Sequence, residues 1–130
     1  MAGFTAFLSE KVLKHVFGLG SYTPPAQCYA SLHTAAPIEG GASSEVTAGS
    51  YARIPVTLAA IGGEPYMLRN AADMLFAIAL SNWGTITHAG VYDALTGGNL
   101  LAENALDTPR TINTNDRAQF AAATFRVTLT

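Results

Sequence analysis

The amino-acid sequence predicts a mainly-β domain of the β-sandwich or jelly-roll type, with one α-helix at its N-terminus. A helical pattern opens the chain, and about seven or eight short strand-like segments follow it, separated by turn-forming residues. The chain has 130 residues, which is long enough for one hydrophobic core without disulfides or metals. We therefore expect residues 1–130 to form a single domain.

Residues 5–19 carry the helical pattern. Leu8, Val12 and Val16 recur at every fourth position, which places them on one face of a helix. Gly18 favours a stop at the C-terminal end. We expect the apolar face to cover an open end or face of the β-domain. The alternative is that this segment is an arm that docks on a neighbouring subunit.

The β-domain is predicted to occupy residues 26–130. Apolar and polar residues alternate in 26–34 and again in 51–58, as they do in half-buried strands. Pro55 has no N–H to donate, so the second strand is predicted at a sheet edge or at a bulge. Residues 35–50, which are rich in Gly, Ser and Ala, follow neither period and predict a long loop. A loop of this length in a small domain is usually functional or mobile.

A β-hairpin is predicted at the centre of the sheet. Residues 86–92 favour extended backbone, and residues 93–99 include the turn-forming residues Asp, Gly and Asn. The return strand begins at Leu100. Residues 86–92 and the return strand are therefore predicted to be adjacent strands at the centre of the sheet.

The remaining segments are shorter. Strands are predicted within 64–70 and 110–112, a turn at 107–109, and one or two closing strands over 118–130. Residues 71–80 are apolar enough for a helix, but the segment is short and lies between strand-like segments. We therefore predict strand and irregular backbone there.

The chain is poor in charge. Charged residues make up 12% of it, whereas typical globular proteins have roughly 25%. Interface cores are depleted in Lys, Glu and Asp, so this composition indicates a surface that other subunits cover. The alternative is a surface made merely polar by Thr, Ser, Asn and Gly.

Several classes of partner and location are disfavoured. The net charge is −2 and the basic residues are scattered, which argues against a nucleic-acid partner. No stretch of 18 apolar residues occurs, so no membrane span is predicted. The N-terminus lacks the order of a signal peptide, so we expect synthesis in the cytoplasm without secretory export.

No motif for catalysis, cofactor binding or metal binding occurs in the sequence. His15, His33 and His88 have none of the spacings of metal-binding motifs. Cys28 is the single cysteine, which excludes a disulfide within one chain. No serine lies in a nucleophile-elbow motif. We therefore expect no catalytic residues, no cofactor and no metal.

Aromatic residues are spread along the chain and include one tryptophan, Trp83. Large aromatic side chains most often serve as core or interface anchors. The alternative is a platform of exposed Trp83 or tyrosines on which a sugar ring stacks.

Five segments in a fixed order resemble a family of small bacteriophage virion proteins that are often labelled "phage tail fibre protein". The segments are YTPPAQCYASLHT, GSYARIPVTL, NWGTITHAGVYDALTGGNLL, ALDTPRTIN and the closing FRVTLT. The resemblance extends from the N-terminal helix to Leu129. It implies a structural component of a phage particle with no catalytic residues to carry over.

The expected function is that of a capsid decoration or cement protein at the capsid surface. A fibre shaft usually shows repeats, a coiled coil or a collagen-like tract, and this sequence has none. A cement protein binds only the assembled shell and stabilises it by mass action. The expected partners are the major capsid protein and copies of the chain itself, as dimers or trimers. The alternative is a tail-fibre or tail-tip module that recognises host glycans.

We expect the partner-facing surface around the helix and residues 35–50. It is predicted from the large apolar and aromatic residues in and beside these segments, namely Phe4, Phe7, Leu8, Phe17, Tyr22, Ile38, Val46 and Tyr51.

Overall fold

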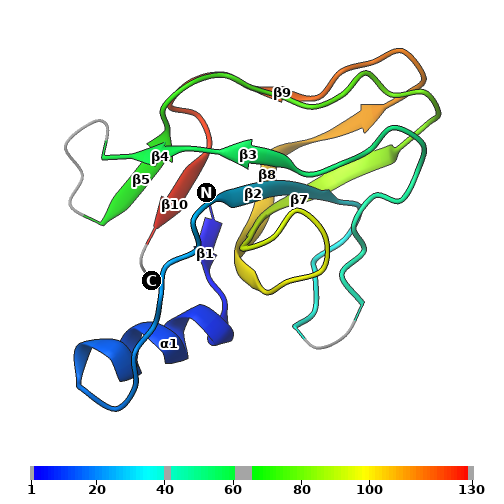
Figure 1. Ribbon diagram of the computed structural model, residues 1–130. Coiled ribbons are helices and arrows are strands. Elements are labelled where there is room, and N and C mark those ends of the chain that lie inside the picture. Colours follow the sequence, from blue (N-terminus) through cyan, green and yellow to red (C-terminus); the bar gives the residue numbers. More distant parts are fainter. Residues whose placement is uncertain (1, 40–41, 61–65, 129–130) are drawn as a thin grey trace.

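The computed structural model describes residues 2–39, 42–60 and 66–128, which contain one helix and ten strands (Figure 1). In chain order these are β1 (Ala2–Phe4), α1 (Ala6–Val16), β2 (Cys28–His33), β3 (Ile54–Val56), β4 (Leu58–Ala59), β5 (Met67–Asn70), β6 (Met74–Leu75), β7 (Gly84–Tyr92), β8 (Leu100–Ile112), β9 (Gln119–Phe120) and β10 (Arg126–Thr128). The predicted mainly-β domain with one N-terminal helix is confirmed. The start of the strand predicted within 64–70 and the end of the segment 118–130 lie outside the described residues.

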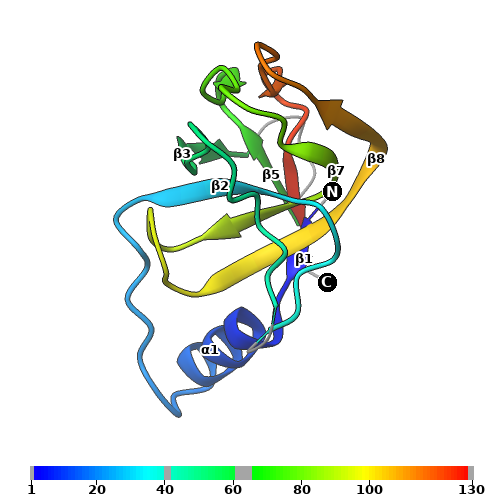
Figure 2. The same ribbon diagram turned by 90° about the vertical axis from the view of Figure 1, so that its right-hand side faces the viewer.

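Eight strands form one sheet in the order β3, β2, β7, β8, β1, β10, β5 and β4, and β6 pairs with β9 beside it. The first and last strands of this order, β3 and β4, are consecutive in the chain and separated only by Thr57. The sheet therefore curls until it is nearly closed (Figures 1 and 2). Among the described pairs, β1 with β10 is parallel and the others are antiparallel.

The central hairpin is confirmed as β7 and β8. Its turn is closed by Asp93, whose carboxylate accepts the backbone N–H of Asn99 at 2.7 Å and the side-chain amide of Asn99 at 3.1 Å. Gly97 and Gly98 both have positive φ there, 62° and 72°. A side chain at position 98 would also overlap the Asp93 carboxylate, so this turn requires glycine for two reasons.

Strand β8 corrects one prediction, because residues 107–109 do not turn the chain. The ladder with β7 pairs His88 with Ala105 and Ile86 with Arg110, so two steps along β7 correspond to five steps along β8. The extra residues form a large bulge inside one continuous strand of 13 residues. Sequence reasoning took Asp and Pro as a turn, whereas the ladder resumes on the same neighbour beyond them.

The other strand predictions agree with the structure. Pro55 lies in β3, which is an end strand of the eight-stranded order and pairs only with β2 there. The segment 71–80 contains only the two-residue β6 and otherwise irregular backbone, as predicted. Alternation within this segment buries Met74 and Phe76 and leaves Leu75 exposed.

The helix α1 is shorter than predicted. It begins after Thr5, whose hydroxyl oxygen accepts the N–H of Leu8 at 3.4 Å and donates to a carbonyl of β8. It ends at Val16 rather than at residue 19, because Gly18 takes a φ of 76° and the N–H of Leu19 bonds back to the carbonyl of Lys14 at 2.8 Å.

The hydrophobic core fills the inside of the curled sheet. Leu32, Phe76 and Ile86 are among its most deeply buried side chains. Trp83 is 4% exposed, donates its indole N–H to the carbonyl of Gly49 at 3.2 Å, and meets the Tyr51 ring edge to face. Burial of each such large apolar side chain stabilises the fold by about 1.5–3 kcal/mol.

Candidate protein–protein interface

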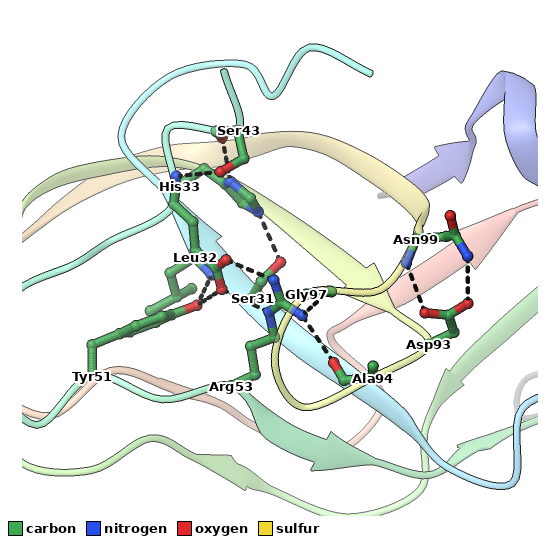
Figure 3. A network of polar contacts seen from close by, with 11 residues as sticks. Ser31, Leu32, His33, Ser43, Tyr51, Arg53, Asp93, Ala94, Gly97 and Asn99 are labelled. Atoms are coloured by element: carbon green, nitrogen blue, oxygen red, sulfur yellow. Dashed lines mark hydrogen bonds and ion pairs between the residues drawn. The ribbon is translucent and has the colours of Figure 1, made fainter. Parts of the chain in front are cut away.

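A polar cluster holds the loop 35–50 against the hairpin turn (Figure 3). Arg53 donates from Nε and Nη2 to the two carboxylate oxygens of Glu45, each at 2.9 Å. Its Nη1 donates to the carbonyls of Ala94 and Gly97, at 2.9 and 2.7 Å, in the turn of the central hairpin. The ion pair is bidentate and little exposed to solvent, so it fixes the loop to the hairpin. We call Arg53, Glu45 and Tyr51, with the carbonyls of Ala94 and Gly97, the polar clamp.

Two tyrosines complete the surroundings of this ion pair. The Tyr51 hydroxyl donates to Glu45 at 2.6 Å and accepts the backbone N–H of Leu32 at 3.0 Å. The Arg53 guanidinium lies 3.5 Å from the ring centre of Tyr92. Burial raises the pKa of Tyr51, and the hydrogen bond to Glu45 raises it further. Burial alone would raise the pKa of Glu45, but the hydrogen bonds from Arg53 and Tyr51 outweigh it and leave this pKa lowered.

His33 is fully buried beside the clamp. Its Nδ1 lies 2.7 Å from the carbonyl of Ser43, which can only accept, so Nδ1 carries the proton. Its Nε2 then accepts the hydroxyl hydrogen of Ser31 at 2.8 Å. Burial lowers the pKa of His33, so the neutral ring is favoured. Both ring nitrogens are used within the protein, and His33 holds the loop in place.

The same loop also fixes the start of α1. The Glu39 carboxylate accepts the backbone N–H groups of Ala6 and Phe7, at 2.7 and 3.1 Å. A negative charge at a helix N-terminus contributes about 0.3–1 kcal/mol at an exposed position. The predicted long loop is therefore anchored, in its described residues, both to the hairpin and to the helix.

Beyond its first turns, α1 leaves the domain. Phe7 and Leu8 are partly buried against the core, but no residue of the helix is fully buried. Four apolar side chains at its C-terminal end are 58–79% exposed, and we call them the apolar arm: Leu13, Val16, Phe17 and Leu19. The helix projects below the sheet in Figures 1 and 2.

This geometry corrects the expectation that the whole apolar stripe of α1 covers the β-domain. Leu8 meets the core, whereas Val16 and Leu19 face solvent. The helix is attached by its first turn, through Thr5 and Glu39, so its far end extends past the sheet.

A second exposed apolar stretch lies on the opposite side of the molecule. Leu75, Ile78 and Leu80 face outward from β6 and the segment after it, while Phe76 and Ala79 alternate with them into the core. Strand β6 pairs with β9, which is at the top of Figure 1, and α1 is at the bottom. The described surface therefore carries exposed apolar side chains at both ends.

The predicted interface residues fall into three groups. Phe17 and Ile38 are exposed. Phe4, Phe7, Leu8 and Tyr22 are partly buried. Val46 belongs to the core and Tyr51 to the polar clamp. Sequence reasoning missed Leu13, Val16 and Leu19 as surface residues, because helical spacing does not show where a helix leaves the sheet.

The idea of a sugar platform on Trp83 is wrong, because Trp83 is a core residue. Tyr66 is exposed, whereas Tyr92 is buried against the guanidinium of Arg53.

Within the described part of the chain, no group of three or more His, Cys, Asp or Glu side chains is placed to hold a metal ion. No described helix is long and apolar enough to cross a membrane. The thiol of Cys28 is partly buried in β2, and burial raises its pKa.

Comparison with known proteins gives one family. A family model described as "Podophage GP4 fiber I protein gp80" matches residues 3–128, which is nearly the whole chain. No curated protein matches the sequence.

Proposed function

Because the chain belongs to the family described as podophage GP4 fiber I protein gp80, it is a structural phage protein, and we propose that the apolar arm attaches it to the virion. The observation that carries this proposal is the exposure of Leu13, Val16, Phe17 and Leu19 beside one another at the end of α1. Contiguous exposed apolar side chains mark protein–protein contacts on soluble proteins.

The arm is well prepared for binding. Its base is fixed by the Thr5 cap and by the Glu39 carboxylate, so little ordering of the helix remains to be done when a partner binds. Full burial of one Leu, Val or Phe side chain is worth about 1.5–3 kcal/mol, of which part is offset by the loss of freedom on association. Four such side chains are enough for a persistent contact.

The role we propose is non-enzymatic. The buried ionisable groups that could have formed a reactive centre are His33, Glu45 and Arg53, and each bonds another part of the fold. Their arrangement supports a rigid scaffold for the arm. Partners are further copies of the chain and other proteins of the particle.

The family description supports a fibre component as the first candidate location. Capsid decoration is the second candidate, and one observation favours it. The described residues form a nearly closed sheet with an 11-residue helix, and no fibrous element extends from it. In this second case the major capsid protein is the main partner.

The copy number in purified virions separates the two locations. Quantitative mass spectrometry should give a number far below that of the major capsid protein for a fibre component, and a comparable number for a decoration protein. Immunogold labelling should then place the chain at fibres or over the whole shell. Absence from purified particles would refute both candidates.

A matched pair of variants tests the arm itself. Phe17→Ser combined with Val16→Ser should abolish incorporation into particles, because both side chains are exposed and the fold does not need them. Leu95→Ser, on the exposed turn of the hairpin, is the control and should be incorporated normally. Normal incorporation of the double variant would refute the role of the arm.

A further inference from the structure

The second half of β8 has a free edge. On one side β8 pairs with β7 as far as Ile112. On the other side β1 pairs only with Ala102 and Glu103. From Asn104 to Ile112, no strand of the described residues pairs with β8 on this side. The backbone N–H and C=O groups of such an edge are a ready template for another strand.

A groove lies beside this edge. Strand β1 lies between β8 and β10, and its pairing with β10 begins at Ala2 opposite Val127. Among the described residues, no strand lies between the rest of β8 and the segment that leads into β10. A groove of about 730 Å³ lies here. Its walls are residues 104–112 and 116–126, and its floor includes Leu32 and Ile86.

Arginines gather along this groove. Arg110, Arg117 and Arg126 line it, and they are three of the five arginines in the chain. The Nε of Arg126 is buried without a hydrogen-bond partner among the described residues, and its Nη2 is 4.0 Å from the carboxylate of Asp107. The side chains of Arg110 and Arg117 donate no hydrogen bond within the described part of the protein.

The charge of the groove is positive overall. Its other charged residues are Asp107 and Asp116, so three positive charges face two negative ones. Asp116 already accepts the backbone N–H of Asn113 at 2.9 Å, and Asp107 is largely in solvent. Guanidinium groups with free donors recognise carboxylates in a bidentate manner.

We propose that this groove receives an extended acidic segment of another virion protein, which adds a strand beside β8. The proposal rests on the structural role proposed above and names the chemistry of one partner. Backbone hydrogen bonds to the β8 edge supply affinity, and glutamate or aspartate side chains of the partner bind Arg110, Arg117 and Arg126. The bulge and Pro109 limit the pairing to residues 110–112, because on the other flank Gly3 is opposite Glu103 and Ala2 therefore lies beside Asn104.

A strand fits this groove better than a saccharide does. Residues 110–112 of β8 line the groove, so a polypeptide placed there can bond to their backbone. An acidic saccharide could use the arginines but not the backbone edge.

The test uses a capped heptapeptide that alternates valine and glutamate. Titration followed by NMR should show saturable binding, and hydrogen exchange should show new protection at amides of residues 110–112. The same peptide with alternate N-methylated residues should bind at least about tenfold more weakly, a difference of about 1.4 kcal/mol, because it cannot form a ladder. A valine–lysine peptide should lose at least as much affinity.

Variants identify the arginines. Arg110→Gln combined with Arg117→Gln should weaken binding of the glutamate peptide by about tenfold or more, because the glutamate carboxylates lose charge-assisted hydrogen bonds from two guanidinium groups. Lys11→Gln, which removes one positive charge from α1, is the control and should leave binding unchanged.

Three results would overturn the proposal: no saturable binding, equal binding of the N-methylated peptide, or protection elsewhere than in β8. Binding of an oligogalacturonate in place of the peptide would also overturn it and would assign the groove to an acidic saccharide. Failure here is distinguishable from failure of the proposed function, because the arm variants report on incorporation into virions and not on this groove.

Discussion

Arg53 and Arg126 lie in opposite environments. Arg53 bonds Glu45 through two nitrogens, the hairpin turn through a third, and the ring of Tyr92 through its face. Arg126 lines the open groove and has a buried Nε without a partner among the described residues. An arginine is part of the scaffold where the fold supplies hydrogen-bond acceptors for its donors. It is available to a partner where the fold leaves donors without acceptors.

The two environments predict different losses of stability when the arginine is removed. Removing one member of a buried, hydrogen-bonded ion pair leaves the other charge uncompensated. Removing an arginine whose donors face solvent or the groove leaves no buried charge without its partner. We therefore expect substitutions in the polar clamp to lower the free energy of unfolding most. Substitutions of the groove arginines should mainly weaken binding of a partner.

The largest effect is expected from Arg53→Met. It leaves the Glu45 carboxylate without its ion-pair partner and should lower the free energy of unfolding by about 3–5 kcal/mol. Urea unfolding followed by Trp83 fluorescence measures this change. The double variant Arg53→Met with Glu45→Gln should recover part of the loss, because no charge is then left unpaired. A loss below about 1 kcal/mol for the single variant, the range of surface ion pairs, would show that the clamp is no stronger than those.

A smaller loss is expected from Tyr51→Phe. The hydroxyl bridges Glu45 and the backbone of Leu32, so its removal should cost about 1.5–3 kcal/mol, as for hydrogen bonds to charged groups. The matched control is Tyr66→Phe, since Tyr66 is exposed and its variant should unfold like the parent protein. Equal stability of the two variants would contradict the role of the Tyr51 hydroxyl.

Acid should weaken the same region. Burial lowers the pKa of His33 in the folded protein, so the unfolded chain binds a proton first. The stabilisation is complete above the ordinary histidine pKa of 6.5 and is lost as pH falls through the lowered value. Glu45, whose pKa is also lowered, adds a further loss below 4.5. Unfolding free energies measured from pH 8 to pH 4 should fall, and His33→Gln should flatten the upper part of that fall. A profile unchanged by this substitution would argue against a buried neutral ring.

The smallest effect on stability is expected from Arg110→Gln and Arg117→Gln. Both side chains are exposed, so each variant should unfold within about 0.5 kcal/mol of the parent protein. Thermal and urea unfolding check this, with Lys11→Gln as a charge-matched control. A loss comparable with that of Arg53→Met would show that the groove arginines belong to the scaffold.

Much of the secondary structure could be predicted from local pattern. Alternation indicated β2 and β7, Pro55 indicated an edge, and Gly18 indicated the end of the helix. The turn predicted at 107–109 failed because Asp and Pro occur in bulges as well as in turns, and only the pairing with β7 distinguishes the two.

The candidate surfaces could be predicted only in part. Charge depletion and the apolar residues of the helix pointed to the N-terminal segment, and Phe17 and Ile38 are exposed as a contact would require. Whether that segment meets another protein stays a prediction. Val46, Tyr51 and Trp83 could not be assigned from sequence, because an apolar or aromatic side chain suits a core and an interface equally well.

The sequence alone determined which segments are extended, which one is helical, how little charge the chain carries and which family it resembles, since these depend on neighbours within a few residues. Only the tertiary structure decided that the end of α1 projects from the sheet, that Arg53 bonds the hairpin turn while the Nε of Arg126 has no partner among the described residues, and that β1 pairs with β8, in the described part of the chain, only at Ala102 and Glu103. Each of these depends on where distant segments meet, and that depends on closing the sheet around one core.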